Sequence, residues 1–431
     1  MEKLFKLNEH GTTIQKELAA GLTTFLTMAY ILAVNPGMLG SIGQGMTPGA
    51  VFTATALAAA IATLVMGFAA NLPIGLAPGM GLNAFFTYSV VFGMGYSWQI
   101  ALTAVFCEGL LFIILSFFNV REAIIKAIPI NLKNAVAVGI GLFITLIGLV
   151  NAGIVVGDTG TITGLGNLTS GSALVAFIGL VIMIVLYVLK IPGAILIGIL
   201  ITTIVGIPFG VTAVPSGFSP IRIPDAPLFM QFDFSTVLSL KFFVVFFTFL
   251  FVDIFDTVGT LVGVTTQGGL INKKGEIPRV KQALLADAVG TVAGAALGTS
   301  TVTSYVESTA GVAVGGRTGL TALSTGVLFL LALFLGPVFL LVPSAATAPA
   351  LILVGFLMMK SVSGIDFSDP AEGIPSFLAI VMMPFAYSVA EGIVYGILSY
   401  VILKIVTGKA KDVTPVTWVL FAIFIFRFFI T

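Results

Sequence analysis

Charge is scarce in this sequence. Only 9% of its 431 residues are Asp, Glu, Lys or Arg and 58% are hydrophobic, whereas a soluble domain carries about 25% charged residues. Cys107 is the single cysteine, which excludes a disulfide framework and a cysteine-based metal cluster. The single histidine, His10, lies outside every long apolar run, so proton transfer within a membrane would have to use carboxylates. A net charge of +1 without a basic stripe argues against a nucleic-acid partner.

Long apolar runs make up most of what is present, and they predict an all-α polytopic membrane protein in a lipid bilayer. Seven runs lie at about residues 18–34, 50–70, 75–92, 99–118, 132–150, 174–189 and 193–207, and seven more at about 238–264, 283–297, 301–314, 320–342, 346–359, 374–387 and 392–406. A polar, proline-rich stretch separates the two sets. We therefore predict 14 transmembrane segments as two inverted repeats of seven, residues 1–225 and 226–410, because an odd-numbered unit repeated in one membrane must be inverted.

The positions of the basic residues predict the orientation. If the N-terminus is cytoplasmic and every run crosses, sixteen of the nineteen Lys and Arg residues lie in cytoplasmic segments, as the positive-inside rule requires. We expect a multi-pass protein of the cytoplasmic membrane with both termini in the cytoplasm. The C-terminal hydrophobic helix, within 411–431, is about 16 residues or roughly 24 Å long and contains Arg427, so we expect an interfacial or edge-packed helix and not a fifteenth span.

Two runs are interrupted near their midpoints and occupy the same place in each set. The third, LPIGLAPGMGLNAFF, contains Pro73 and Pro78, and the tenth, TSTVTSYVESTAGV, begins with residues that favour an extended backbone and ends with small helix-compatible ones. Paired broken segments of this kind indicate a transporter binding site between the repeats. Two alternatives remain: the prolines only kink an ordinary helix, or the tenth run is a packing helix with one buried, neutral Glu307.

Six acidic residues lie in or at the edge of apolar runs: Glu108, Asp253, Asp256, Asp287, Glu307 and Glu391. Lys241 and Lys404 are near the ends of runs, where their long side chains can reach the interface, so the six carboxylates are not predicted to be halves of ion pairs. For Glu108 and Asp287 we expect hydrogen bonds to Ser or Thr within the helix packing.

The remaining acids carry the predicted chemistry. Asp253 and Asp256 are three residues apart and share one helix face, so one of them could bind and release a proton. Glu307 lies where the tenth run changes from extended to helical, and a carboxylate at that depth is a functional site by default. Asn83 of the third run is its expected counterpart. An amide and carboxylates suit a neutral polar heterocycle or a cation, and they would repel an anionic substrate.

The sequence then resembles a known family. The segments NEHGTTIQKELAAGLTTFLTMAYILAVNPGML, LAPGMGLNAFF, FDTVGTLVGVT, KKGEIPRVKQALLADA and TSTVTSYVESTAGVAVGGRTGLTA are similar to those of AzgA-type purine permeases of the nucleobase transporter superfamily, over essentially the whole chain. The resemblance implies a uracil-permease-like fold, with a core domain of spans 1–4 and 8–11 and a gate domain of spans 5–7 and 12–14. It also implies proton-coupled uptake of adenine, guanine or hypoxanthine, with a homodimer possible and no cofactor.

Matched residue by residue, the resemblance places Asp256, Glu307 and Asn83 at the substrate site, and Tyr305 and Gly81 lie in the same motifs and are candidates with them. Asp256 and Glu307 are the candidates for proton coupling. Overall likeness favours guanine and hypoxanthine, with adenine possible. A passive facilitator or channel of the same fold, for small neutral heterocycles, is the alternative function. An enzyme is not expected, because the sequence offers no nucleophile–base pair, metal cluster or phosphate-binding loop.

Overall fold

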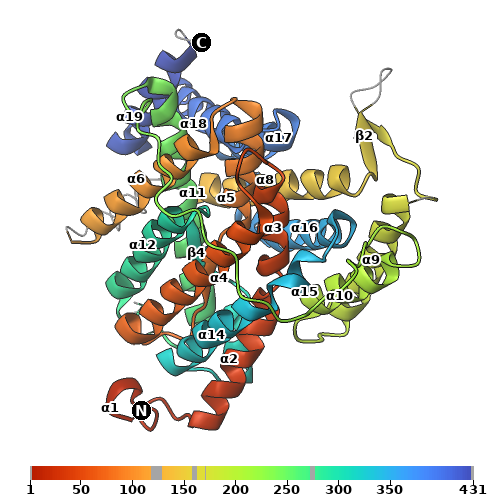
Figure 1. The fold of residues 1–431 in the computed structure, drawn as a ribbon. Coiled ribbons are helices and arrows are strands. Elements are labelled where there is room, and N and C mark those ends of the chain that lie inside the picture. The colour runs from red at the N-terminus through yellow and green to blue at the C-terminus, as the bar shows by residue number, and fades with distance from the viewer. Residues whose placement is uncertain (1, 118–128, 158–162, 170, 272–276, 429–431) are drawn as a thin grey trace.

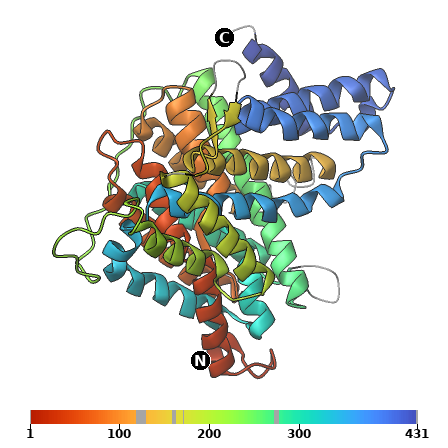
Figure 2. The ribbon, with the colours of Figure 1, turned by 90° about the vertical axis from the view of Figure 1, so that its right-hand side faces the viewer.

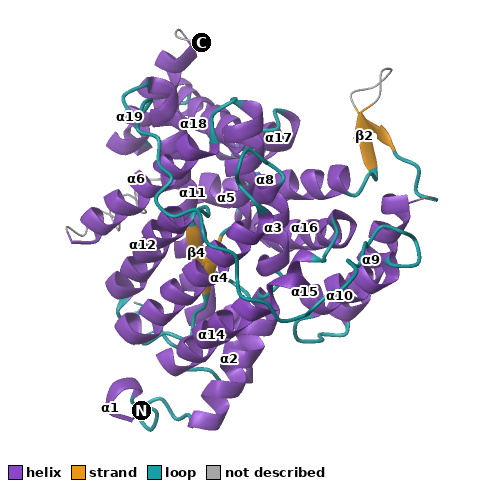
Figure 3. Ribbon diagram, in the orientation of Figure 1, coloured by secondary structure: helices purple, strands orange, loops and turns teal. Residues whose placement is uncertain are grey.

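The computed structural model describes residues 2–117, 129–157, 163–169, 171–271 and 277–428. Most of this part of the chain is helical (Figure 3). Within it, ten helical segments are long and apolar enough to cross a membrane, and four shorter apolar helices accompany them. The prediction of an all-α polytopic membrane protein is confirmed at this level. Fourteen crossings remain a prediction, and Arg121, Lys126, Lys273 and Lys274, which we counted as cytoplasmic, lie outside the described residues.

One group of helices packs together in the left and centre of Figure 1, and we call it the first bundle. It contains α2 (Ile14–Met28), α3 (Ile31–Gly40), α4 (Pro48–Val65), η1 (Met66–Ala70), α5 (Met80–Ala84), η2 (Phe85–Gly93), α6 (Trp98–Phe117), α11 (Leu240–Gln267), α12 (Val280–Leu297), α13 (Ser308–Val314), α14 (Gly319–Ala332), η3 (Leu333–Leu335) and α15 (Gly336–Leu340). Helix α4 packs against α12 and α14, and α2 packs against α13 and α14. Glycines allow the close approach: a Cβ on Gly319 would lie 2.0 Å from the carbonyl oxygen of Gly67.

A second bundle consists of α8 (Ile130–Asn151), α9 (Gly171–Val188), α10 (Ala194–Gly206), α16 (Ser344–Met358), η4 (Met359–Gly364), α17 (Pro370–Phe385) and α18 (Val389–Val406). Helix α8 packs against α16, α17 and α18, while α9 and α10 pack against each other and against α16. The α8–α16 contact again depends on glycine, since a Cβ on Gly355 would lie 2.4 Å from the carbonyl oxygen of Gly141. The two bundles thus combine helices from both halves of the sequence.

The two ends of the chain lie on opposite sides of the molecule (Figures 1 and 2). The short helix α1 (Glu2–Phe5) lies beside the first bundle, where Asn71 donates a hydrogen bond to the carbonyl oxygen of Phe5. After η5 (Ala410–Asp412), helix α19 (Pro415–Phe428) packs against α18. The ring of Phe424 on α19 lies 6.3 Å from that of Phe247 on α11. Helix α19 therefore contacts both bundles.

Two short antiparallel strand pairs interrupt the helices. Strands β2 (Val155–Gly157) and β3 (Thr163–Leu165) form an exposed ribbon that projects from the molecule (Figure 3). Strands β1 (Leu76–Pro78) and β4 (Val302–Ser304) pair at the centre of the first bundle, with every residue buried. The third and tenth runs are therefore broken and meet, as predicted. The alternative in which prolines only kink a continuous third helix is wrong, because residues 71–79 are not helical and residues 76–78 form a strand.

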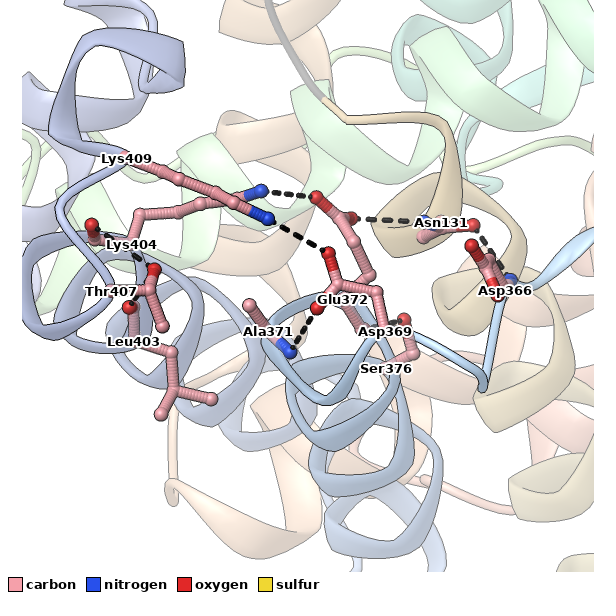
Figure 4. Close-up of polar contacts among 10 residues, drawn as sticks. All are labelled: Asn131, Asp366, Asp369, Ala371, Glu372, Ser376, Leu403, Lys404, Thr407 and Lys409. Atoms are coloured by element: carbon pink, nitrogen blue, oxygen red, sulfur yellow. Dashed lines mark hydrogen bonds and ion pairs between the residues drawn. The ribbon is translucent and has the colours of Figure 1, made fainter.

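A polar cluster in the second bundle corrects the expectation for Lys404. This lysine does not extend to an interface: its side chain is buried, and its Nζ lies 2.7 Å from Oε1 of Glu372 on α17 (Figure 4). Oε2 of the same glutamate accepts a hydrogen bond from Asn131 of α8 at 2.9 Å. Sequence inspection did not include Glu372 among the membrane acids, because it precedes the thirteenth apolar run. The cluster ties α8, α17 and α18 together.

Candidate functional site

The paired strands β1 and β4 form the frame of the site. Their residues face each other as Leu76 with Ser304, Ala77 with Thr303 and Pro78 with Val302. Backbone hydrogen bonds continue at both ends, from Gly79 N to Thr301 O and from Tyr305 N to Gly75 O, each 3.0 Å long. The strand backbones thereby satisfy one another where neither segment is helical, which is the condition for non-helical backbone inside a membrane protein.

Glu307 follows β4 and occupies the N-cap position of α13. Its side chain is half-buried. The Tyr30 hydroxyl, from the turn between α2 and α3, donates to Glu307 Oε1 at 2.7 Å, and Thr27 Oγ1 lies 3.3 Å from the Glu307 carbonyl oxygen. The structure thus places a carboxylate where an extended segment gives way to a helix, with one oxygen held by a residue of the first run.

Asp256 lies on α11, which packs against β4 and α13. Its side chain is also partly buried. The charge of Glu307 acts on Asp256 and on the hydroxyl groups of Tyr30 and Tyr305, so these four groups share one electrostatic environment. The carboxylates can accept hydrogen bonds from N–H donors, and the two tyrosine rings, with centroids 6.4 Å apart, supply apolar surface beside them.

Asp253 lies one turn before Asp256 on α11. It is fully buried, and its Oδ1 lies 3.3 Å from Thr257 Oγ1. The same threonine hydroxyl lies 2.6 Å from Asp287 Oδ1 on α12. Thr301 Oγ1 likewise donates to Glu108 Oε2 at 2.9 Å. The prediction that Glu108 and Asp287 are bonded to hydroxyl side chains is confirmed.

The other polar candidates, Asn83 and Tyr305, make hydrogen bonds to residues in or next to the strand pair. Asn83 is fully buried; its Oδ1 accepts from Ser300 and its Nδ2 donates to Pro78 O at 3.4 Å. Both polar atoms of Asn83 therefore have protein partners, which connect the two broken segments, and its direct substrate contact stays a prediction. Tyr305 also donates to Pro78 O, at 2.5 Å.

Gly81 lies at the contact between the two bundles. A Cβ at this position would lie 2.6 Å from Cγ2 of Ile140 on α8, so the glycine lets the second bundle approach the broken third run closely. The geometry thus gives Gly81 a packing role next to the site.

Sequence inspection missed Tyr30 and Glu17. Tyr30 stands in the middle of an apolar run, and the available signal was that a buried tyrosine hydroxyl needs a hydrogen-bond partner. Glu17 is fully buried, although it belongs to the polar N-terminal segment; its oxygens accept from the backbone N–H groups of Arg317 and Thr321 at 2.9 and 3.1 Å. It anchors the start of α14. No group of three potential metal ligands occurs among the residues that the structure describes.

Comparison with known proteins now identifies the family. The sequence profile of the Permease family matches residues 15–425. The chain belongs to this family. It is 47% identical to the guanine/hypoxanthine permease PbuG of Bacillus subtilis (strain 168), over 99% of both chains, and 44% identical to the adenine permease AdeP of Escherichia coli (strain K12), over 99% of this chain and 95% of AdeP. The resemblance to AzgA-type permeases is confirmed, and the protein is a permease and not an enzyme.

The fold also resembles that of a solved transporter domain. The transmembrane domain of a cyanobacterium bicarbonate transporter, BicA, superposes with a TM-score of 0.63, covering 89% of this chain and 97% of that domain at 15% sequence identity. This likeness concerns the fold alone.

Proposed function

We propose that this permease takes up purine nucleobases across the cytoplasmic membrane and couples their movement to protons. The observation that carries the proposal is the strand pair β1–β4, which brings the two broken runs together beside the carboxyl groups of Glu307 and Asp256. The relatives named as guanine/hypoxanthine and adenine permeases support a purine substrate. The identity is slightly higher to the guanine/hypoxanthine permease, 47% against 44%, so we propose guanine and hypoxanthine as the preferred substrates, with adenine possible.

Glu307 is the proposed substrate contact. A purine presents N–H donors along one planar edge, and a carboxylate oxygen accepts such bonds. The buried rings of Tyr30 and Tyr305 lie next to this carboxylate and line its surroundings on the protein side. We propose that Asn83 and Gly81 support the site through the contacts described above.

Asp256 is the proposed proton carrier. It lies on the long helix α11, is partly exposed, and interacts electrostatically with Glu307. A proton bound at one of two neighbouring carboxylates lowers the cost of burying the other, which links protonation to substrate binding. We further propose that the first bundle (spans 1–4 and 8–11) moves against the second (spans 5–7 and 12–14) during transport.

The first experiment tests substrate and coupling in proteoliposomes. Radiolabelled hypoxanthine uptake driven by an inward proton gradient is competed with unlabelled adenine, guanine, xanthine and uracil. We expect guanine and hypoxanthine to compete best, and a protonophore to abolish accumulation. Uptake that only equilibrates and ignores the protonophore would establish the passive facilitator instead.

The second experiment separates the two acids. Glu307→Gln should weaken hypoxanthine binding by about tenfold or more, because losing a charged hydrogen-bond acceptor costs about 1.5–3 kcal/mol. Asp256→Asn resembles the protonated acid, so we expect binding to survive and accumulation against a gradient to fail. Glu9→Gln, which removes an exposed carboxylate paired with Lys6, is the control for charge loss. If Asp256→Asn accumulates hypoxanthine with normal pH dependence, the proton site lies elsewhere.

A further inference from the structure

Tyr30 occupies an unusual place in the first apolar run. Sequence inspection predicted one continuous segment there, but the structure divides it at Ala29 and Tyr30 into α2 and α3. Tyr30 is 1% exposed, so its hydroxyl group needs a partner inside the protein. That partner is Oε1 of Glu307, 277 positions away in the sequence and 2.7 Å from the hydroxyl oxygen.

The end of α2 also lies against the main chain of Glu307. Thr27 Oγ1, at the last turn of α2, lies 3.3 Å from the carbonyl oxygen of Glu307, while its hydroxyl hydrogen has a nearer acceptor in the carbonyl oxygen of Thr24 at 2.8 Å. Glycine permits this approach, because a Cβ on Gly311 of α13 would lie 2.0 Å from Thr24 Oγ1. The end of α2 therefore packs against the backbone at Glu307, and Tyr30 holds one oxygen of its carboxylate.

We infer that Tyr30 is a positioning residue, which holds Oε1 of Glu307 and thereby presents Oε2 of the same carboxylate to an N–H donor of the substrate. This inference rests on the proposed function, in which Glu307 contacts a purine. A hydroxyl hydrogen can be donated to one acceptor at a time. While Tyr30 donates to Oε1, rotation of the carboxylate is restrained, and the substrate does not have to supply the free energy that orders it.

If Tyr30 positions Glu307, Tyr30→Phe should change hypoxanthine binding in opposite directions in the wild type and in Glu307→Gln. In the wild type, Tyr30→Phe removes the hydroxyl and keeps the ring, so the carboxylate must be ordered on binding. Ordering a side chain costs about 0.5–1.5 kcal/mol, which corresponds to about 2- to 12-fold weaker binding.

In Glu307→Gln, the Tyr30 hydroxyl would donate to the amide oxygen. The NH₂ group of the amide would then face the N–H of the substrate, and the two donors would repel each other. The amide could rotate with Tyr30 intact only by leaving the buried hydroxyl hydrogen without its acceptor. Removing the hydroxyl frees the amide to present its oxygen. Tyr30→Phe should therefore strengthen binding in the Glu307→Gln background, by about threefold or more on the same ordering scale.

The test is equilibrium binding of radiolabelled hypoxanthine to the purified full chain, for the wild type, Tyr30→Phe, Glu307→Gln and the double variant, each checked for monodispersity. Tyr187→Phe, on α9 of the second bundle, is the matched control and should leave binding unchanged. Weaker binding in the wild-type background together with stronger binding in the Glu307→Gln background supports the inference.

Equal losses in both backgrounds would show that Tyr30 acts through packing, and an unchanged affinity in the wild-type background would show that it does not position Glu307. Either result overturns the positioning role alone. Unchanged hypoxanthine binding in Glu307→Gln would overturn the substrate contact in the proposed function as well, so the two failures are distinguishable.

Discussion

The ion pair between Lys404 and Glu372 gives a prediction about the second bundle that does not depend on the transported substrate. Their side chains are 5% and 16% exposed and lie 2.7 Å apart. Glu372→Gln keeps the size and the hydrogen-bonding capacity toward Asn131 but leaves the buried ammonium group without its counter-charge. Breaking such a pair from one side typically destabilises a protein by about 3–5 kcal/mol. We expect a loss of this size for Glu372→Gln.

The neighbouring pair of Lys409 and Asp369 is the matched control. It is 3.3 Å long with side chains 50% and 34% exposed, so we expect Asp369→Asn to cost about 0.2–1 kcal/mol. Asparagine also caps helices as well as aspartate does, so the start of α17 should be preserved. Glu372→Gln and Asp369→Asn each remove one negative charge from the same region of the protein (Figure 4).

The assay is thermal unfolding of the purified protein in detergent, followed by loss of the monodisperse peak, at fixed protein and lipid concentration. Membrane protein unfolding is often irreversible, so only differences between variants heated identically are compared. Lys404→Met combined with Glu372→Gln removes both charges and should recover most of the loss, because no uncompensated buried charge remains. If the double variant is no more stable than Glu372→Gln, or if Asp369→Asn is equally destabilising, burial of the pair is not the cause and the reasoning fails.

Three further predictions follow from other parts of the molecule. Gly81→Ala should reduce transport in the same proteoliposome assay, because the added methyl group pushes the two bundles apart. Adding Ile140→Ala should restore part of the transport. If it does not, contact with Ile140 is not the cause of the loss. Glu17→Ala should destabilise the protein by about 1–3 kcal/mol, because backbone N–H groups at the start of α14 lose their acceptor, and unchanged thermal unfolding would contradict this. Cysteine at Thr163 should react with an impermeant reagent added outside cells and cysteine at Lys411 should not, in a background without the native cysteine; the opposite pattern would invert the predicted topology.

Much of the fold and part of the site could be predicted from the sequence. Apolar runs are local, and the described helices lie where the runs are. The interruptions in the third and tenth runs are also local, since proline, glycine and β-branched residues weaken a helix regardless of what surrounds them. The sequence also singles out Glu307, because a carboxylate within an apolar run is costly, and its role at the site stays a prediction.

Only the tertiary structure shows which residues pair with one another. The pairing of Leu76 with Ser304, the hydrogen bond from Tyr30 to Glu307 and the ion pair of Lys404 with Glu372 each join residues far apart in the chain. Nothing within a run shows which neighbouring helix its polar atoms will meet. That depends on how the helices are rotated and shifted against one another, which close packing between small residues determines across the whole bundle. For this reason the sequence could not show that the polar atoms of Asn83 bind the backbone and a serine of the two broken segments, and its contact with a substrate stays a prediction.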